Sequence, residues 1–357
     1  MKMHNFNSGP SILPKEVLHE AAEAIYNFNN IGLSILEIGH RTDWFIRVIE
    51  EAKSLVKELL QLDENFEVLF LHGGATTQFM QVPMNFLDAS NGAAYCVNGI
   101  WGKKAIAEAK LFGPAAIAGS SADTNFTFIP KDLNIPANSS YLHFTSNNTV
   151  EGTQWHSFPN ADVPMVSDMS SDIFSRKMDF KKCSLIYAGA QKNAGIAGTT
   201  MVIIRKDFLD KKNQRIPAIM DYQNHISAGS LLNTPPVFAI YVSLLTLRWI
   251  KREGGIEEME KRSIEKSSFF YDALDKLPLF IPSVVKEDRS HMNAVFTIED
   301  KNLENTFLQA CSDNGMIGIK GHRSIGGLRV SMYNALPMES LELLVQLMEQ
   351  FSHKYSS

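Results

Sequence analysis

Residues 184–205, SLIYAGAQKNAGIAGTTMVIIR, place one lysine in a glycine- and alanine-rich loop between two apolar runs. The runs SLIYA (184–188) and TMVIIR (200–205) are nearly continuous in apolar residues, which is typical of strands in a sheet covered on both faces. Between them, the alanines and glycines near Lys192 take up little space and offer its ammonium group no opposite charge. Because an ammonium group is costly to bury without a partner, this loop is the first candidate for a functional site.

Other parts of the chain extend this strand–loop–strand pattern into a larger α/β arrangement. Four more short apolar runs are predicted to be buried strands: EVLFLH (67–72), AAYCV (93–97), YLHFT (141–145) and PMVSD (164–168). Helices are expected between or after them, from the 3.6-residue apolar period or from flanking prolines and glycines, at 46–60, 102–112 and 235–255. The alternation predicts a mostly parallel sheet over about residues 16–250. After Gly255, long helices enclose weaker strands at 293–298 and 326–333, which predicts a smaller α+β domain.

Composition excludes several classes of function. The 357 residues carry 34 Lys and Arg against 39 Asp and Glu, so no basic excess favours nucleic acid or an anionic membrane. No apolar run reaches the roughly 20 residues that span a bilayer, and the first residues lack the apolar core of a signal peptide. The three cysteines, Cys96, Cys183 and Cys311, share no metal-ligand spacing. We therefore expect reduced thiols, no metal site and a cytoplasmic protein.

Unusual residues follow several of the predicted strands, where open α/β sheets bind their ligands. The segment GGATTQFMQ (73–81) opens a helix, and its N–H groups suit a phosphate, although a glycine turn is often only a turn. Trp101 stands at the next strand-to-helix junction, either as an ordinary core residue or as a flat ring for a planar ligand. Asp168 ends an apolar strand, either as a helix cap or as the partner of a cationic ring nitrogen.

Lys192 completes this set, 24 residues after Asp168. An exposed loop lysine is the ordinary alternative, but the small residues around it favour a pocket. A lysine in such a pocket can form a Schiff base because desolvation lowers its pKa. Lysine, carboxylate, aromatic ring and phosphate turn together fit pyridoxal phosphate, whose aldehyde, ring nitrogen and phosphate need these partners.

The sequence also resembles the phosphoserine aminotransferases, a family of fold-type I, class V pyridoxal-phosphate enzymes. The resemblance runs nearly end to end, and AGAQKN (188–193) together with KGHRSIGGLR (320–329) is specific within the wider superfamily. Further matching segments are FNSGPSILP (6–14), EIGHRTDWF (37–45), LFLHGGATTQF (69–79), NGIWGKKA (98–105), SNNTVEGTQ (146–154), SDMSSDI (167–173) and NTPPVFAIY (233–241). The resemblance implies an α/β fold with a mostly parallel seven-stranded sheet. It also implies an N-terminal segment (1–15) that contributes to the active site, a large domain (16–255) and a small C-terminal α+β domain (256–357).

The resemblance assigns roles toward pyridoxal phosphate. Lys192 would form the Schiff base and shuttle a proton, Asp168 would pair with the ring nitrogen, and Trp101 would stack on the ring. The other implied cofactor residues are Ala75, Thr76, Thr149 and Gln191, together with Asn233 and Thr234, which would reach the phosphate in the neighbouring subunit. The implied assembly is therefore a homodimer.

The resemblance also implies the substrates phosphoserine, glutamate, 2-oxoglutarate and 3-phosphohydroxypyruvate, used in serine biosynthesis. Members of the family can also act on a phosphorylated hydroxythreonine in pyridoxine biosynthesis. Arg329 would bind the α-carboxylate, since arginine offers a fixed fork of donors for such groups. The remaining implied substrate residues are Ser8, His40, Arg41, His322 and Arg323. Thr76 replaces an arginine found in some members, so distal-anion binding would rest mainly on the two His–Arg pairs.

Two alternatives stay open from the sequence. One is another class V enzyme, such as an alanine–glyoxylate aminotransferase or a cysteine desulfurase. A desulfurase needs a reactive cysteine on a loop, and none of the three cysteines fits that position. The other alternative is a non-catalytic scaffold with this fold, which the presence of both Lys192 and Asp168 disfavours.

Overall fold

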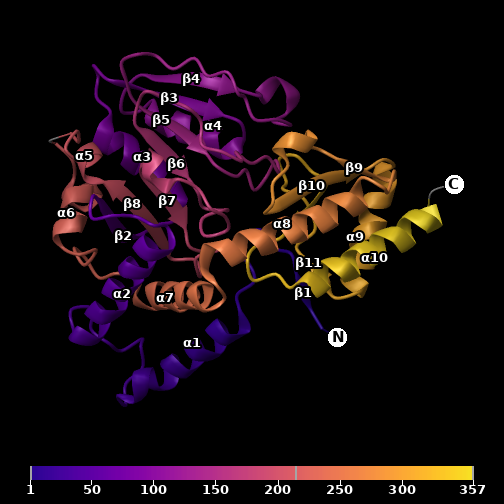
Figure 1. Cartoon of the computed structure of the whole chain (residues 1–357), viewed down its shortest axis with the longest axis horizontal. Helices are drawn as coiled ribbons and strands as arrows, with labels where there is room; N and C mark the ends of the chain where they lie inside the picture. Colours follow the sequence, from indigo (N-terminus) through magenta and orange to yellow (C-terminus); the bar gives the residue numbers. More distant parts are fainter. Residues whose placement is uncertain (1, 214, 356–357) are drawn as a thin grey trace.

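The computed structural model describes residues 2–213 and 215–355, and its largest element is a seven-stranded sheet (Figure 1). The strand order is β2-β8-β7-β6-β5-β3-β4. β8 runs antiparallel to both of its neighbours, and all other pairs are parallel. The mostly parallel seven-stranded sheet is therefore confirmed. The strands are β2 (Phe66–His72), β3 (Gly92–Val97), β4 (Ala115–Ser120), β5 (Ser139–Thr145), β6 (Met165–Asp168), β7 (Cys183–Gly189) and β8 (Thr199–Arg205).

The apolar pattern located six of these strands and missed β4. The sequence of β4, AAIAGS, contains small residues, and only Ala118 is buried. β4 lies at the edge of the sheet and pairs with β3 alone. An edge strand needs no continuous apolar run, because it is not covered like the central strands.

Helices cover both faces of the sheet. Alternate residues of β2 enter different cores: Val68 and Phe70 pack with α1, α2 and α7, whereas Leu69 and Leu71 pack with α3, α4 and α6. This alternation is what a strand buried on both faces requires. The helices are α1 (Lys15–Asn27), α2 (Asp43–Leu59), α3 (Ala75–Phe86), α4 (Ile100–Ala109), α5 (Lys206–Leu209), α6 (Tyr222–Ser227) and α7 (Val237–Arg252).

The C-terminal part forms a second core beside the large sheet (Figure 1). Its antiparallel sheet has the order β12-β10-β9 and packs against α8, α9 and α10. One helix, α8, belongs to both cores, since Ile256 packs with the large sheet and Phe270 with the small one. The elements are α8 (Gly255–Leu274), β9 (Phe280–Pro282), β10 (Asn293–Ile298), α9 (Glu304–Asp313), β12 (Leu328–Ser331) and α10 (Met338–Tyr355).

The N-terminal segment connects the small core to the lysine loop. β1 (His4–Asn5) pairs in parallel with β11 (Met316–Ile317). A few residues later, Ser11 donates through its backbone N–H to the carbonyl of Gln191 and through its hydroxyl to the carbonyl of Lys192. The segment therefore links the C-terminal core to the loop between β7 and β8. Across residues 2–213 and 215–355, no helix has the length and apolar character needed to cross a membrane.

Candidate active site

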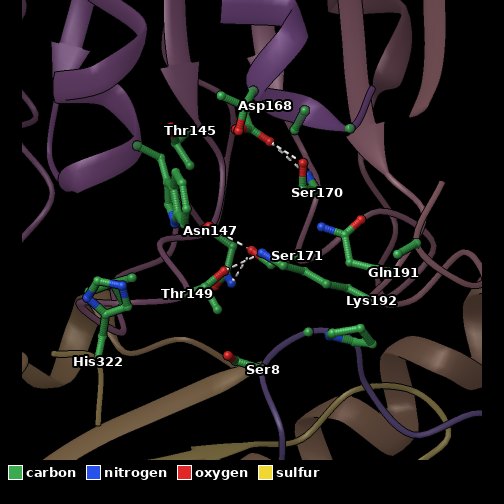
Figure 2. Close-up of a pocket in the computed structure, with 18 of the residues that line it drawn as sticks. Ser8, Thr145, Asn147, Thr149, Asp168, Ser170, Ser171, Gln191, Lys192 and His322 are labelled. Carbon is green, nitrogen blue, oxygen red and sulfur yellow. Dashed lines mark hydrogen bonds between the residues drawn. The ribbon is translucent and has the colours of Figure 1, made fainter. Parts of the chain in front are cut away.

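A cavity of about 610 Å³ opens where β5, β6 and β7 end, between the large sheet and the C-terminal core (Figure 2). Its size is ordinary for a small-molecule site. Ten of the residues predicted from the sequence line it: Ser8, Ala75, Thr76, Trp101, Thr149, Asp168, Gln191, Lys192, His322 and Arg329. They come from the N-terminal segment, from the starts of α3 and α4, from the ends of β5, β6 and β7 and the loops after them, and from the C-terminal part. Only the folded chain brings them together.

Lys192 stands in the loop after β7, and its Nζ donates a hydrogen bond to Thr149 Oγ1 at 2.6 Å (Figure 2). Burial lowers the pKa of Lys192 to about 8, and the nearby Asp168 carboxylate opposes this effect. The glycines of the loop are needed for its path. Gly195 has a φ of +147°, and a Cβ there would lie 2.8 Å from Ser243 Oγ. The loop therefore holds the lysine in a fixed position, with an amine that loses its proton more readily than usual.

Asp168 is the last residue of β6, and its carboxylate is buried. Its Oδ1 accepts hydrogen bonds from the Ser170 N–H at 3.0 Å and the Ser170 hydroxyl at 2.6 Å (Figure 2). Burial raises the pKa of Asp168, whereas the bonds from Ser170 and the charge of Lys192 lower it. No helix begins at this residue, so the helix-cap alternative does not describe it. A buried carboxylate on the strand next to Lys192 is suited to pair with a cation in the cavity.

Arg329 brings a positive charge to the cavity from β12, and the Glu151 carboxylate acts on it without forming an ion pair. Its guanidinium donates to Ser8 Oγ at 2.7 Å and to the carbonyl of Thr149 at 3.2 Å, and its Nε is buried without a partner. Among the described residues, no carboxylate forms an ion pair with it. Burial lowers the pKa of Arg329. Since a buried charge is costly without a partner, this geometry suits a carboxylate ligand.

The turn before α3 and the start of α4 form the opposite wall. Gly73 and Gly74 have φ values of +101° and +81°, and a Cβ on Gly73 would lie 2.2 Å from Thr77 Oγ1. This turn therefore requires glycine, and it directs the first N–H groups of α3 toward the cavity edge. Trp101 lies in the first turn of α4 and lines the cavity, with its Nε1 buried and unpartnered. An anion-binding turn and a flat ring therefore face the same space.

Comparison with known proteins agrees with this arrangement. A family model for class V aminotransferases matches residues 3–344. A phosphoserine aminotransferase of Bacteroides thetaiotaomicron is 52% identical over 353 residues, which are 98% of this chain and 99% of that protein. The chain belongs to the class V aminotransferase family.

Two solved structures of phosphoserine aminotransferases extend the likeness of this class V aminotransferase to three dimensions. The enzyme of Bacillus circulans subsp. alkalophilus superposes with a TM-score of 0.97 at 42% identity, covering 99% of both chains. The PLP-bound enzyme of Trichomonas vaginalis gives a TM-score of 0.93 at 34% identity, covering 98% of this chain and 100% of that one.

Five predicted site residues of this class V aminotransferase lie outside the cavity of their own chain: His40, Arg41, Asn233, Thr234 and Arg323. Arg41 and Arg323 are exposed, whereas His40 has a buried Nε2 without a partner in the described chain. Thr234 lies beside His72, the last residue of β2, and its carbonyl oxygen is 2.7 Å from His72 Nε2. The roles of these five residues stay predictions.

The class V aminotransferase site also contains a buried polar layer that sequence reasoning did not single out. Asp172 accepts hydrogen bonds from the Ser146 hydroxyl, from Gln154 Nε2 at 3.2 Å and from Arg176 Nη2 at 2.7 Å. Glu151 accepts from the N–H of Ile100 at 2.7 Å and so caps α4 from another loop. The available signal was the run of polar residues in 146–154 and 167–173, directly after apolar strands. The C-terminal part helps to enclose this layer, since Asn147 Nδ2 donates to Asn293 Oδ1 and the N–H of His291 donates to Gln154 Oε1.

Proposed function

We propose that the chain is a phosphoserine aminotransferase that transfers an amino group reversibly from L-glutamate to 3-phosphohydroxypyruvate. The products are 2-oxoglutarate and O-phospho-L-serine, which places the reaction in L-serine biosynthesis. The observation that carries the proposal is one cavity that contains Lys192, the buried Asp168 and the unpaired Arg329. The high identity to enzymes named phosphoserine aminotransferase supports this choice of substrate.

The cofactor is pyridoxal phosphate, and the residues around the cavity fit it. The glycine turn before α3 lines the cavity at Gly73 and Gly74, with Ala75, Thr76 and Gln191 beside it for the phosphate. Trp101 offers the flat wall for the ring. Asp168 offers the carboxylate for the ring nitrogen, and Lys192 the amine for the aldehyde. Thr149, which holds Lys192, completes the set.

When bound, this cofactor supplies an electron sink for the negative charge that forms at the substrate α-carbon. The carboxylate of Asp168 would hold the ring nitrogen and would favour its protonated form. Because the pKa of Lys192 is lowered to about 8, part of its amine is neutral near pH 7 and can take the α-carbon proton. Thr149 fixes the position of Nζ for this transfer, and Arg329 orients the substrate through its α-carboxylate.

The distal phosphate or carboxylate of the substrate binds His322, Arg323, His40 and Arg41 in this proposal, and Ser8 supports Arg329. Only His322 of the four distal residues lines the cavity of the single chain. This agrees with a homodimer in which Asn233 and Thr234 reach the phosphate site of the second copy. Analytical ultracentrifugation with activity measured on the separated species tests this assembly. A fully active monomer would contradict it.

The domain limits 1–15, 16–255 and 256–357 and a cytoplasmic location are part of the same proposal. Two separate cores support the division, with α8 as the continuous link between them. Limited proteolysis tests the division, because cleavage is expected in exposed segments near these limits rather than within either core. Cell fractionation tests the location.

A direct assay tests the function. The purified chain, saturated with pyridoxal phosphate, is mixed with L-glutamate and 3-phosphohydroxypyruvate, and 2-oxoglutarate is measured with a coupled dehydrogenase. We expect turnover to be much faster than with alanine and glyoxylate under the same conditions. Turnover with alanine and glyoxylate but not with glutamate and 3-phosphohydroxypyruvate would favour the alanine–glyoxylate alternative. No turnover with either substrate pair would favour a non-catalytic scaffold. A phosphorylated hydroxythreonine in the reverse direction tests the pyridoxine-pathway activity.

A further inference from the structure

The edge of the cavity near His322 carries several positive charges, and the nearby Glu151 carboxylate partly offsets only that of Arg329 among those named below. The pKa of His322 is lowered by burial and by the positive charges of Arg329, Arg323 and Lys104. Within residues 2–213 and 215–355, none of these three cations forms an ion pair. His322 lies across the cavity from Gln191 and Lys192 (Figure 2). This side of the cavity therefore attracts anions. The imidazole of His322 itself is mainly neutral near pH 7, because its pKa is lowered.

Lys104 differs from an ordinary surface lysine because it is held against the cavity wall. Its Nζ lies 4.7 Å from the centroid of the Trp101 indole ring, a distance that gives a cation–π interaction. Trp101 lines the cavity, and the helix turn that carries it is fixed by the bond from Ile100 N–H to Glu151. Glu108, one helical turn further on, does not pair with Lys104. The Lys104 ammonium thus lies against a ring that lines the cavity, and it forms no ion pair with a carboxylate of the described residues.

We propose that Lys104 is a specificity-determining residue that favours substrates with a second anionic group over substrates that carry only the α-carboxylate. The inference rests on the proposed function, because it takes the α-carboxylate to bind Arg329. A substrate held there can place its other end near His322, which lines the cavity, and so near the charges of Lys104 and Arg323 that act on His322. His322 can donate a hydrogen bond to a phosphate but contributes little charge near pH 7. Lys104 adds a full positive charge from helix α4. This charge attracts the distal phosphate dianion of phosphoserine but not the methyl group of alanine.

The chain supplies a matched control in Lys103. It is the preceding residue of α4 and is also exposed, but its ammonium group forms no cation–π interaction with the Trp101 ring. We compare Lys104→Met, which keeps the length of the side chain without its charge, with Lys103→Met and Lys104→Arg. Because both lysines are exposed, we expect all three variants to fold, which a thermal melt verifies.

The measured quantity is the ratio of kcat/KM for phosphoserine to kcat/KM for alanine in the holoenzyme, with 2-oxoglutarate as acceptor. We expect Lys104→Met to lower this ratio by about three- to tenfold, as removal of one exposed charge near a dianion allows. Lys103→Met and Lys104→Arg should keep the ratio within about twofold. An equal loss on both substrates in Lys104→Met would overturn the proposal, since it would indicate only a role in placing Trp101. An equal change in Lys103→Met would also overturn it.

A binding measurement separates this inference from the proposed function. The holoenzyme and its variants are titrated calorimetrically with inorganic phosphate, which requires no turnover. Weaker phosphate binding in Lys104→Met, with unchanged binding in Lys103→Met, supports the role of Lys104 even if wild type fails to transaminate phosphoserine. That failure would count against the proposed function alone. Equal phosphate affinity in all variants would overturn the inference, whatever the wild-type activity.

Discussion

Replacement of Thr149 by valine tests how the cavity sets the basicity of Lys192. The change keeps the shape of the side chain but removes Oγ1, which accepts the hydrogen bond from Lys192 Nζ at 2.6 Å. Burial already lowers the pKa of this amine to about 8. In wild type, the hydrogen bond to Thr149 stabilises the charged amine more than the neutral one, so its removal disfavours the charged form. The pKa of Lys192 in Thr149→Val should therefore fall further.

The size of the effect follows from the charge on the donor. A hydrogen bond that involves a charged group contributes about 1.5–3 kcal/mol, and one pKa unit corresponds to about 1.4 kcal/mol. A shift of about one unit is thus the smallest that we expect, from about 8 to about 7. At pH 7 the neutral fraction of the amine would rise from about one tenth to about one half, a roughly fivefold increase.

The assay follows the capture of pyridoxal phosphate by the apoenzyme, because only the neutral amine attacks the aldehyde. The capture rate, read from visible absorbance, should rise with pH around the pKa of Lys192. Its midpoint should lie near pH 8 in wild type and near pH 7 in Thr149→Val. Thr145→Val is the matched control, since Thr145 lines the same cavity and its buried Oγ1 has no partner. An unchanged midpoint in Thr149→Val, or an equal shift in Thr145→Val, would refute the reasoning.

Four other substitutions test the site and its loop. Lys192→Ala should still bind pyridoxal phosphate, but borohydride should fix the cofactor covalently only in wild type; normal turnover of the variant would exclude the proton-transfer role. Arg329→Ala should reduce kcat/KM for phosphoserine, glutamate and alanine alike, whereas Arg323→Ala should reduce it mainly for the two substrates with a second anion. Equal profiles for these two arginine variants would show that their roles are assigned wrongly. Gly195→Ala should lower the free energy of unfolding by about 2–4 kcal/mol, because its φ of +147° and a Cβ 2.8 Å from Ser243 Oγ create both strain and overlap; an unchanged melting temperature would contradict this.

The sequence alone predicted the central strands and the residues that end them. Each central strand is buried on both faces, so its apolar run is continuous and visible without any partner. Asp168 and Lys192 interrupt this pattern with charged side chains. Because a buried charge is costly without a partner, these two residues stand out in the sequence as candidates for a site. β4 was missed for the opposite reason, because an edge strand of small residues has no such run.

Only the tertiary structure decided which polar residues share the cavity. Ser8 and Arg329 are separated by 321 positions along the chain, yet they are joined by a hydrogen bond of 2.7 Å because the N-terminal segment and β12 pack in one core. The contact of Thr149 with Lys192 and the cap that Glu151 gives to α4 depend in the same way on loops that meet across the sheet edge. Local sequence patterns record the burial of a strand but not which loop lies opposite it. The lowered pKa of Lys192 is therefore a property of the fold, since burial by distant segments causes it.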